Sequence, residues 1–191
     1  LTSVVIPDSV TSIGKHAFDY CKRMTKIKIP DSVSSIGWFA FTHCRSLTKI
    51  KIPNSINRIE LSTFSNCESL QEVTIPNSIT RIGDFAFCDC ESLIGIYIPD
   101  SVKSIGMETF RNCKSLTYVV VAKGNMVYES RENCNAIIEK ATNTLIYGSR
   151  NTTIPDGVTS IGNYALSGRY RLTKINIPDS VKSIGLMAFE H

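Results

Sequence analysis

Cysteine is the residue with the greatest chemical potential in this 191-residue chain, which contains seven cysteines and three histidines. Five cysteines recur at a constant spacing of 23 residues: Cys21, Cys44, Cys67, Cys90 and Cys113. Thiols can form disulfides, bind zinc or act as nucleophiles, and each use demands different surroundings. The constant spacing assigns one thiol to each unit of a repeat.

A column of one thiol per repeat is unsuited to disulfides. Stacked β-structures repeat every 4.7–4.9 Å or so with equivalent side chains pointing the same way, whereas a disulfide needs Cβ atoms about 3.8 Å apart. We therefore expect buried, reduced thiols that behave as small apolar side chains. Cys88 lies off this column and could be exposed. A Cys88–Cys134 disulfide remains an alternative, although nothing in the sequence favours it. Cys88 and Cys90 fit a zinc site poorly, because one should point inward and the other outward.

No constellation of residues predicts catalysis. The histidines, His16, His43 and His191, lie at variable positions of the repeat. His43 precedes Cys44, but adjacent side chains usually point apart, and a catalytic thiol must be exposed beside an oriented base. Glycines are spread along the chain instead of clustering around a phosphate site, and acidic residues show no calcium-loop spacing. We predict that the chain is not an enzyme and has no catalytic, cofactor-binding or metal site.

An Ile-Pro pair marks the repeat. The prolines lie at Pro7, Pro30, Pro53, Pro76, Pro99, Pro155 and Pro178. Neighbouring prolines are 23 residues apart except for the interval of 56 residues from Pro99 to Pro155, which fits two units with ten extra residues. A fixed period in the twenties predicts a solenoid, in which each unit buries its apolar side against its neighbours.

Each unit divides into three short elements. Segments such as 47–52 alternate apolar and polar residues before the proline, which predicts parallel strands on one face, with 175–177 as the last of them. Val-x-x-Ile predicts a second short extended piece, and the glycine after it suits a tight corner or a positive φ. The x-x-Ala-Phe-x-x-Cys segment predicts one helical turn, with the phenylalanines at the centre of the core. The fold class predicted is therefore an α/β solenoid.

The repeat reads I-P-[DN]-S-[VI]-x-x-I-G-x-x-A-F-x-x-C-x-S-L-x-x-I-x. It resembles the leucine-rich repeat, specifically the 23-residue variety of BspA-like bacterial surface proteins, over nearly the whole chain. The resemblance implies a right-handed superhelix, and we expect one domain over residues 1–191. The sequence departs from the pattern at Glu60, where other units have glycine, at Arg169 in the thiol column, and in the enlarged turn at about 122–154.

The enlarged turn contains two apolar runs, 137–139 and 145–147, around a polar segment with Asn143. This pattern predicts a hairpin. This hairpin has two possible interpretations. It is either a tolerated insertion that keeps the stack of repeats continuous, or a projecting element that adds binding surface.

Composition limits the partners. The net charge of +4 is too small and too dispersed for a nucleic-acid binder, and no apolar run approaches the roughly 18 residues that span a membrane. The first residues show no signal peptide pattern. Because both ends cut through a repeat, we expect this chain to be part of a longer array whose sorting or anchoring segments lie outside it. The resemblance implies a secreted or cell-surface protein.

The outward positions of the predicted sheet are the candidate binding surface. They comprise Lys26, Lys28, Lys49, Lys51, Glu72, Tyr97, Tyr118 and Val120. Exposed aromatic residues favour protein contacts and lysines attract acidic partners, although lysines also simply keep a sheet soluble. The resemblance implies adhesion to extracellular host proteins or other cells. The alternative is a structural spacer that holds another domain away from the cell surface.

Overall fold

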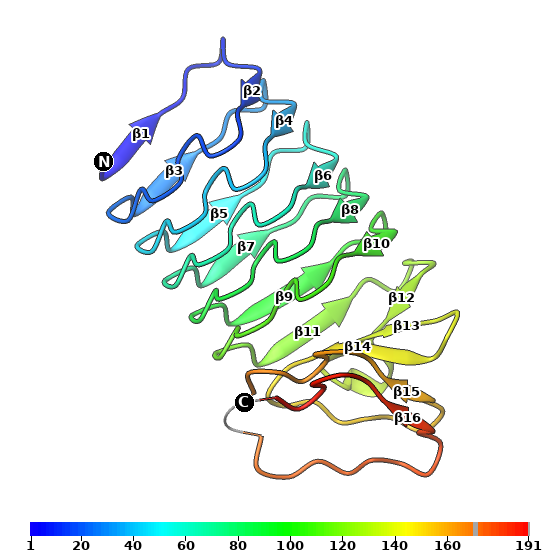
Figure 1. Ribbon diagram of the computed structural model, residues 1–191. Helices are drawn as coiled ribbons and strands as arrows, with labels where there is room; N and C mark the ends of the chain where they lie inside the picture. The colour runs from blue at the N-terminus through cyan, green and yellow to red at the C-terminus, as the bar shows by residue number, and fades with distance from the viewer. Residues whose placement is uncertain (170–171, 191) are drawn as a thin grey trace.

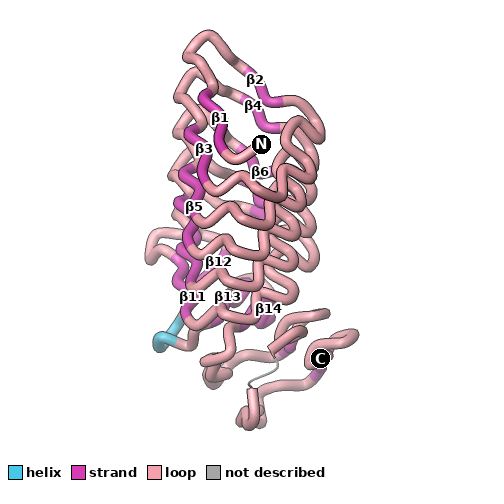
Figure 2. The backbone as a smooth tube through the Cα atoms, turned by 90° about the vertical axis from the view of Figure 1, so that its left-hand side faces the viewer, coloured by secondary structure: helices cyan, strands magenta, loops and turns pink. Residues whose placement is uncertain are grey.

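Each repeat unit folds into one coil, and successive coils stack so that equivalent residues lie above one another (Figure 1). The computed structural model describes residues 1–169 and 172–190, so His191 lies outside the described residues. These residues form a β-solenoid of about eight coils with parallel strands. Figure 2 shows the two rows of strands that run along two sides of the stack.

The first row of strands consists of the residues before each proline. It comprises β1 (Ser3–Val5), β3 (Lys26–Lys28), β5 (Lys49–Lys51), β7 (Glu72–Thr74), β9 (Gly95–Ile98) and β11 (Tyr118–Val121). These strands confirm the alternation in the sequence, but their hydrogen bonds form three parallel pairs, β1–β3, β5–β7 and β9–β11, and not one continuous sheet. The predicted strand at 175–177 is wrong, because β13 of the enlarged turn lies next to β11 instead.

The second row consists of two-residue strands at the Val-x-x-Ile segments. It comprises β2 (Ser12–Ile13), β4 (Ser35–Ile36), β6 (Arg58–Ile59), β8 (Arg81–Ile82), β10 (Ser104–Ile105), β15 (Ser160–Ile161) and β16 (Ser183–Ile184). Equivalent residues of hydrogen-bonded strands pair in parallel register, as Ser12 with Ser35 and Ile13 with Ile36. The predicted second extended piece is confirmed.

The predicted helical turn between this row and the cysteine is wrong. The segment forms consecutive tight turns with two left-handed residues, such as His16 (φ 59°) and Tyr20 (φ 58°) in the first coil. Alternate amides differ in their partners: Ala17 N–H bonds to Gly14 within the coil, whereas His16 N–H and Phe18 N–H bond to the next coil. A helix would direct all amides along its own axis, so only the mixed conformation can link coils. These bonds offset the strain of left-handed non-glycine residues.

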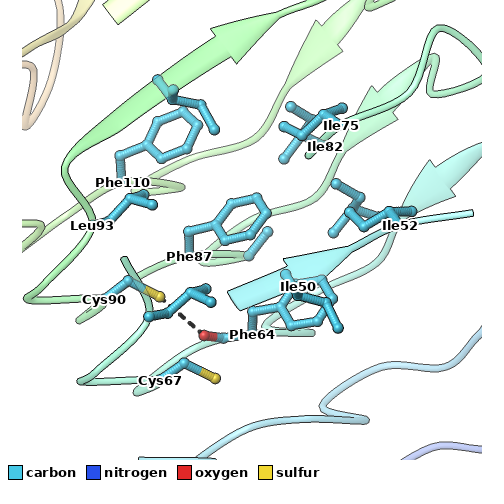
Figure 3. Packing of buried hydrophobic residues seen from close by; sticks show 14 of the residues in the cluster. Ile50, Ile52, Phe64, Cys67, Ile75, Ile82, Phe87, Cys90, Leu93 and Phe110 are labelled. Carbon is cyan, nitrogen blue, oxygen red and sulfur yellow. Dashed lines mark hydrogen bonds between the residues drawn. The ribbon is translucent and has the colours of Figure 1, made fainter. Parts of the chain in front are cut away.

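The phenylalanine column forms the centre of the core, as the sequence predicts. The rings of Phe18, Phe41, Phe64, Phe87 and Phe110 stack in order, with centroid separations from 5.2 Å to 5.8 Å and interplanar angles of 10° or less. Figure 3 shows three of these rings with Cys67 and Cys90 nearby. Phe41, Phe64 and Phe87 are fully buried.

The thiol column is reduced and is buried in four of its five coils, with only Cys21 of the first coil partly exposed, which confirms the expected ladder. All seven cysteines are free. In four consecutive coils the thiol donates a hydrogen bond to the carbonyl of the preceding coil's phenylalanine, as Cys67 does to Phe41 at 3.2 Å. Cys88 is only 5% exposed, because its thiol turns to the Asp89 carboxylate at 3.0 Å, and it forms no disulfide with Cys134.

The glycine before the tight turns is needed for a close approach and not for a positive φ. A Cβ atom on Gly37 would lie 2.6 Å from the backbone nitrogen of Lys15 in the preceding coil. In the first coil, Gly14 has nothing within 4 Å of such an atom. The glycine requirement therefore comes from stacking.

The enlarged turn interrupts the stack and then restores it. It contains β12 (Tyr128–Glu129), the short 3-10 helix η1 (Arg131–Asn133), β13 (Ala136–Glu139) and β14 (Thr144–Gly148). β13 and β14 pair antiparallel, and β14 then pairs parallel with β15, so the hairpin supplies a strand to the second row. Tyr128 and Tyr147 of this turn are both 5% exposed, and their hydroxyl groups accept hydrogen bonds from the Ile105 and Thr109 amides at 3.1 and 2.6 Å.

Candidate functional site

The strand face consists of the outward side chains of β3, β5, β7, β9 and β11. In these strands the inward residues, such as Ile50 and Val119, enter the core, while the alternate residues point to solvent. The structure exposes all eight residues that the sequence selects: Lys26, Lys28, Lys49, Lys51, Glu72, Tyr97, Tyr118 and Val120. They lie along one side of the stack because the strands carrying them lie one above another (Figure 1).

The basic end of the strand face contains two rows of lysines. Lys49 lies 2.8 Å from Glu72 on the paired strand β7, with side chains 69% and 60% exposed. Such an exposed ion pair contributes about 0–1 kcal/mol to stability, but it neutralises part of the basic surface. No ion pair involves Lys26, Lys28 or Lys51 in the part of the chain that the structure describes. These three lysines therefore provide the positive charge of this face.

A groove of about 500 Å³ adjoins this basic end. Lys28 and Lys51 line it together with Asp8, Asp31 and Pro30. Because two lysines and two aspartates line the groove, it suits a polar ligand better than an apolar one.

The aromatic end of the strand face is built by the pairing of β9 with β11. Tyr118 lies opposite Gly95, and Val120 lies opposite Tyr97. A Cβ atom on Gly95 would lie 2.0 Å from Cζ of the Tyr118 ring, so the ring crosses the glycine. Tyr97 and Tyr118 remain 53% and 51% exposed. Sequence reasoning missed this contact, although a glycine at a strand position beside an aromatic residue signals it.

The buried thiols are expected to be unreactive at neutral pH. Burial raises the pKa of the Cys44 and Cys113 thiols to about 12, and it raises the pKa of the Cys67, Cys88, Cys90 and Cys134 thiols as well. A thiol with a raised pKa stays protonated, and the protonated form is a poor nucleophile and metal ligand.

The two described histidines share one carboxylate. His16 Nδ1 lies 2.8 Å and His43 Nδ1 lies 3.5 Å from the Asp19 side chain, and the His43 ring stacks on Tyr20. Across residues 1–169 and 172–190, no group of three or more His, Cys, Asp or Glu side chains is placed to hold a metal ion. Within the same residues, no helix has the length and apolar character needed to cross a membrane.

Comparisons with solved structures identify bacterial relatives. A leucine-rich cell-surface protein from Faecalibacterium prausnitzii is 32% identical, with a TM-score of 0.77 over 99% of this chain and 58% of the other. The pneumococcal vaccine antigen PcpA is 27% identical, with a TM-score of 0.85 over 98% of this chain and 48% of the other. A leucine-rich repeat protein from Bacteroides ovatus is 30% identical, with a TM-score of 0.71 over 96% and 47%. This chain thus spans about half the length of these structures.

A family model agrees with these structures. The model of the BspA-type leucine-rich repeat region matches residues 1–117 and 136–191 in six copies. No curated protein is similar enough to be matched to the chain. The match leaves out the start of the enlarged turn, where the repeat pattern is interrupted, and covers the regular coils on both sides. The chain therefore belongs to the BspA-type leucine-rich repeat family.

Proposed function

We propose that this chain is a non-enzymatic protein-binding module of a bacterial cell-surface or secreted protein, and that the strand face contacts an extracellular protein. The observation that carries the proposal is the composition of this face: three lysines that form no ion pair with any described residue at one end and two half-exposed tyrosines at the other. Large relatives that include a cell-surface protein and a vaccine antigen support the location.

The two ends of the strand face contribute differently to binding. Lysines at the rim of an interface accelerate association with an acidic partner, and salt screens this effect. Tyrosines supply large contact areas at a small entropic cost, so they slow dissociation. The stack below holds both groups in place, since the inward residues of the same strands pack against the core, buried in β5, β9 and β11 and partly buried in β3 and β7. A suitable partner therefore presents an acidic patch beside an apolar one.

The test begins with a binding screen of this chain against extracellular matrix proteins, plasma proteins and bacterial surface proteins. For a partner that binds saturably, the triple variant Lys26→Glu, Lys28→Glu and Lys51→Glu should slow association about ten-fold or more at low salt and flatten the salt dependence. The matched control is Lys103→Glu, Lys174→Glu and Lys182→Glu, three exposed lysines outside the strand face with the same change in net charge.

The aromatic end is tested separately. Replacing Tyr97 and Tyr118 by alanine should weaken affinity at least ten-fold, mostly through faster dissociation. If both the lysine and the tyrosine variants bind as the unchanged protein does, the strand face is not the interface. If no saturable partner emerges, the spacer function takes precedence, in which this chain only separates another domain from the cell surface.

A further inference from the structure

A cavity of about 210 Å³ lies where the enlarged turn interrupts the stack, between the coil of β10 and the coil of β15. We call it the seam cavity. The side chains and backbone that line it include Ile105, Glu108, Glu139, Tyr147, Asn163 and Tyr164. None of these residues belongs to the strand face.

The seam cavity separates two backbone groups that are bonded to each other in every regular coil. At this position of the repeat, His16 N–H bonds to Trp38 C=O at 3.1 Å, and Phe85 N–H bonds to Met107 C=O at 2.9 Å. The enlarged turn occupies the next coil, because Leu145 of β14 is the register partner of Ile161; in this column Glu108 N–H is therefore the last donor before the enlarged turn and Asn163 C=O is the first acceptor after it. Within residues 1–169 and 172–190 neither group makes a hydrogen bond, and both residues line the cavity.

The same interruption leaves a strand edge without a partner strand, although the Tyr128 hydroxyl group accepts a hydrogen bond from Ile105 N–H of β10 at 3.1 Å. β10 is the end strand of the β6–β8–β10 sheet, because β15 pairs with β14 of the hairpin and not with β10. Unpaired edges and backbone groups are the features by which proteins bind extended peptides, since a peptide supplies donors and acceptors at the spacing of the missing strand. At about 210 Å³ the cavity is several times larger than the roughly 30 Å³ of one water molecule, so a short segment fits.

The charge of the lining selects the side chain of the occupant. Two carboxylates, Glu108 and Glu139, line the seam cavity, and no lysine, arginine or histidine among the described residues does. Glu108 already lies 2.8 Å from Arg111, whereas Glu139 accepts only the Thr142 hydroxyl at 2.6 Å in the described part of the chain. Glu139 is therefore the carboxylate that lacks a cation, and the neighbouring tyrosine rings favour a cation too.

We propose that the seam cavity binds an extended peptide segment of a partner protein, with a peptide group bridging Glu108 N–H and Asn163 C=O and a lysine or arginine side chain beside Glu139. The peptide carbonyl accepts from Glu108, and the peptide N–H donates to Asn163, so the segment replaces the missing part of the coil. This site is separate from the strand face and stands whether or not that face binds a protein.

The test uses the tripeptide acetyl-Ala-Lys-Ala-amide at millimolar concentration and the amide NMR spectrum of the isotope-labelled chain. The peptide should shift the amide signals of residues 105–108 and 162–164 in a saturable manner. The same peptide with methylated backbone nitrogens should bind about five-fold more weakly or not at all, because it cannot donate to Asn163. Acetyl-Ala-Glu-Ala-amide should leave the spectrum unchanged.

Two variants complete the test. Glu139→Gln should weaken binding of the lysine peptide about three-fold or more, whereas Glu132→Gln, an exposed glutamate of the same turn outside the cavity, should not. Ile146→Trp should block binding, because the larger side chain of this lining residue fills the cavity, and the unfolding midpoint of each variant shows that it is folded. The proposal is overturned if the lysine peptide shifts no signal at the seam, if methylation of its backbone has no effect, or if Glu139→Gln binds as the unchanged chain does.

Discussion

The hydroxyl group of Tyr147 is inserted into a turn of the coil before it, where it accepts a hydrogen bond from Thr109 N–H at 2.6 Å. The same hydroxyl donates to Gly106 C=O at 3.1 Å. In the regular coils the equivalent amide and carbonyl bond directly, as Ala86 N–H does to Gly83 C=O at 3.3 Å. The ring of Tyr147 also packs edge-on against Phe110, the last ring of the phenylalanine stack, at 5.4 Å. One side chain of the enlarged turn thus ends the stack and completes its last turn.

Replacing Tyr147 by phenylalanine should lower the free energy of unfolding by about 1–3 kcal/mol, because Thr109 N–H loses its buried acceptor while the ring contact remains. Urea unfolding followed by circular dichroism measures this difference. Tyr97→Phe, which removes an exposed hydroxyl group, is the matched control and should change stability by less than about 0.5 kcal/mol. Equal stabilities of Tyr147→Phe and the unchanged chain would show that the hydroxyl group contributes nothing.

The thiol ladder should make stability depend on alkaline pH. Burial raises the pKa of Cys44 from 9.0 to about 12 in the folded chain, so the folded state binds more protons than the unfolded state between these values. The contribution of the protonated Cys44 thiol to the free energy of unfolding is fully present below about pH 9. It is lost as pH rises toward 12, with a slope of about 1.4 kcal/mol per pH unit. Cys44→Ala removes this slope.

The measurement is the stability difference between Cys44→Ala and the unchanged chain at pH 8 and at pH 11. The difference should shrink by about 2–3 kcal/mol over this interval, because only the unchanged chain must hold the thiol protonated. Comparing the two proteins at each pH cancels the titration of all other groups. A difference that is the same at both pH values would contradict the proton linkage.

Thiol labelling distinguishes the buried cysteines from the partly exposed one. Cys21 lies in the first coil and is half-buried, whereas Cys88 is 5% exposed. With iodoacetamide at neutral pH, Cys21 should react first, and the other six thiols only as the chain unfolds. Mass spectrometry of peptides gives the order of labelling. Fast labelling of Cys88 in the native chain would show that its side chain is not held against Asp89.

A methyl group on Gly95 should disturb the strand face without unfolding the protein. In Gly95→Ala the new Cβ occupies the space of the Tyr118 ring, which must swing away from β9. Because the ring is half-exposed, stability should change by less than about 1 kcal/mol. Affinity for a partner of the strand face should fall as much as in Tyr118→Ala. Gly14→Ala, at an exposed position of the first coil where an added Cβ atom meets nothing within 4 Å, is the control, and normal binding by Gly95→Ala would mean that the ring position is unimportant.

The contacts between coils were predictable from the sequence, because equivalent residues of a strict repeat must share one environment. Phe41, Phe64 and Phe87 recur at one spacing, so burying one implies burying the next. The same reasoning places Lys26, Lys49 and Glu72 outward on successive strands. These conclusions need only the register, which a 23-residue period determines directly.

The conformation of the turns was not predictable from the period. Phe39 and Phe85 adopt positive φ values of 58° and 54°, which local preference disfavours in bulky residues. They do so because their amides bond to carbonyls of the next coil, and these bonds exist only after stacking. The sequence alone therefore favours a helical turn, since it shows residues of one coil and not the hydrogen bonds between coils.

Arg169 shows where the repeat pattern stops determining the structure. It occupies the thiol column, and although its side chain is charged it is only 2% exposed. Its guanidinium group donates hydrogen bonds to the Gly148, Ser167 and Phe110 carbonyls. Phe110 C=O is the acceptor that the next thiol of the ladder would use, so a longer side chain here reaches across the interrupted stack. The sequence by itself determined the repeating core and the outward residues, because both follow from register. Only the tertiary structure decided how the enlarged turn closes the stack, because those contacts join residues with no fixed spacing between them.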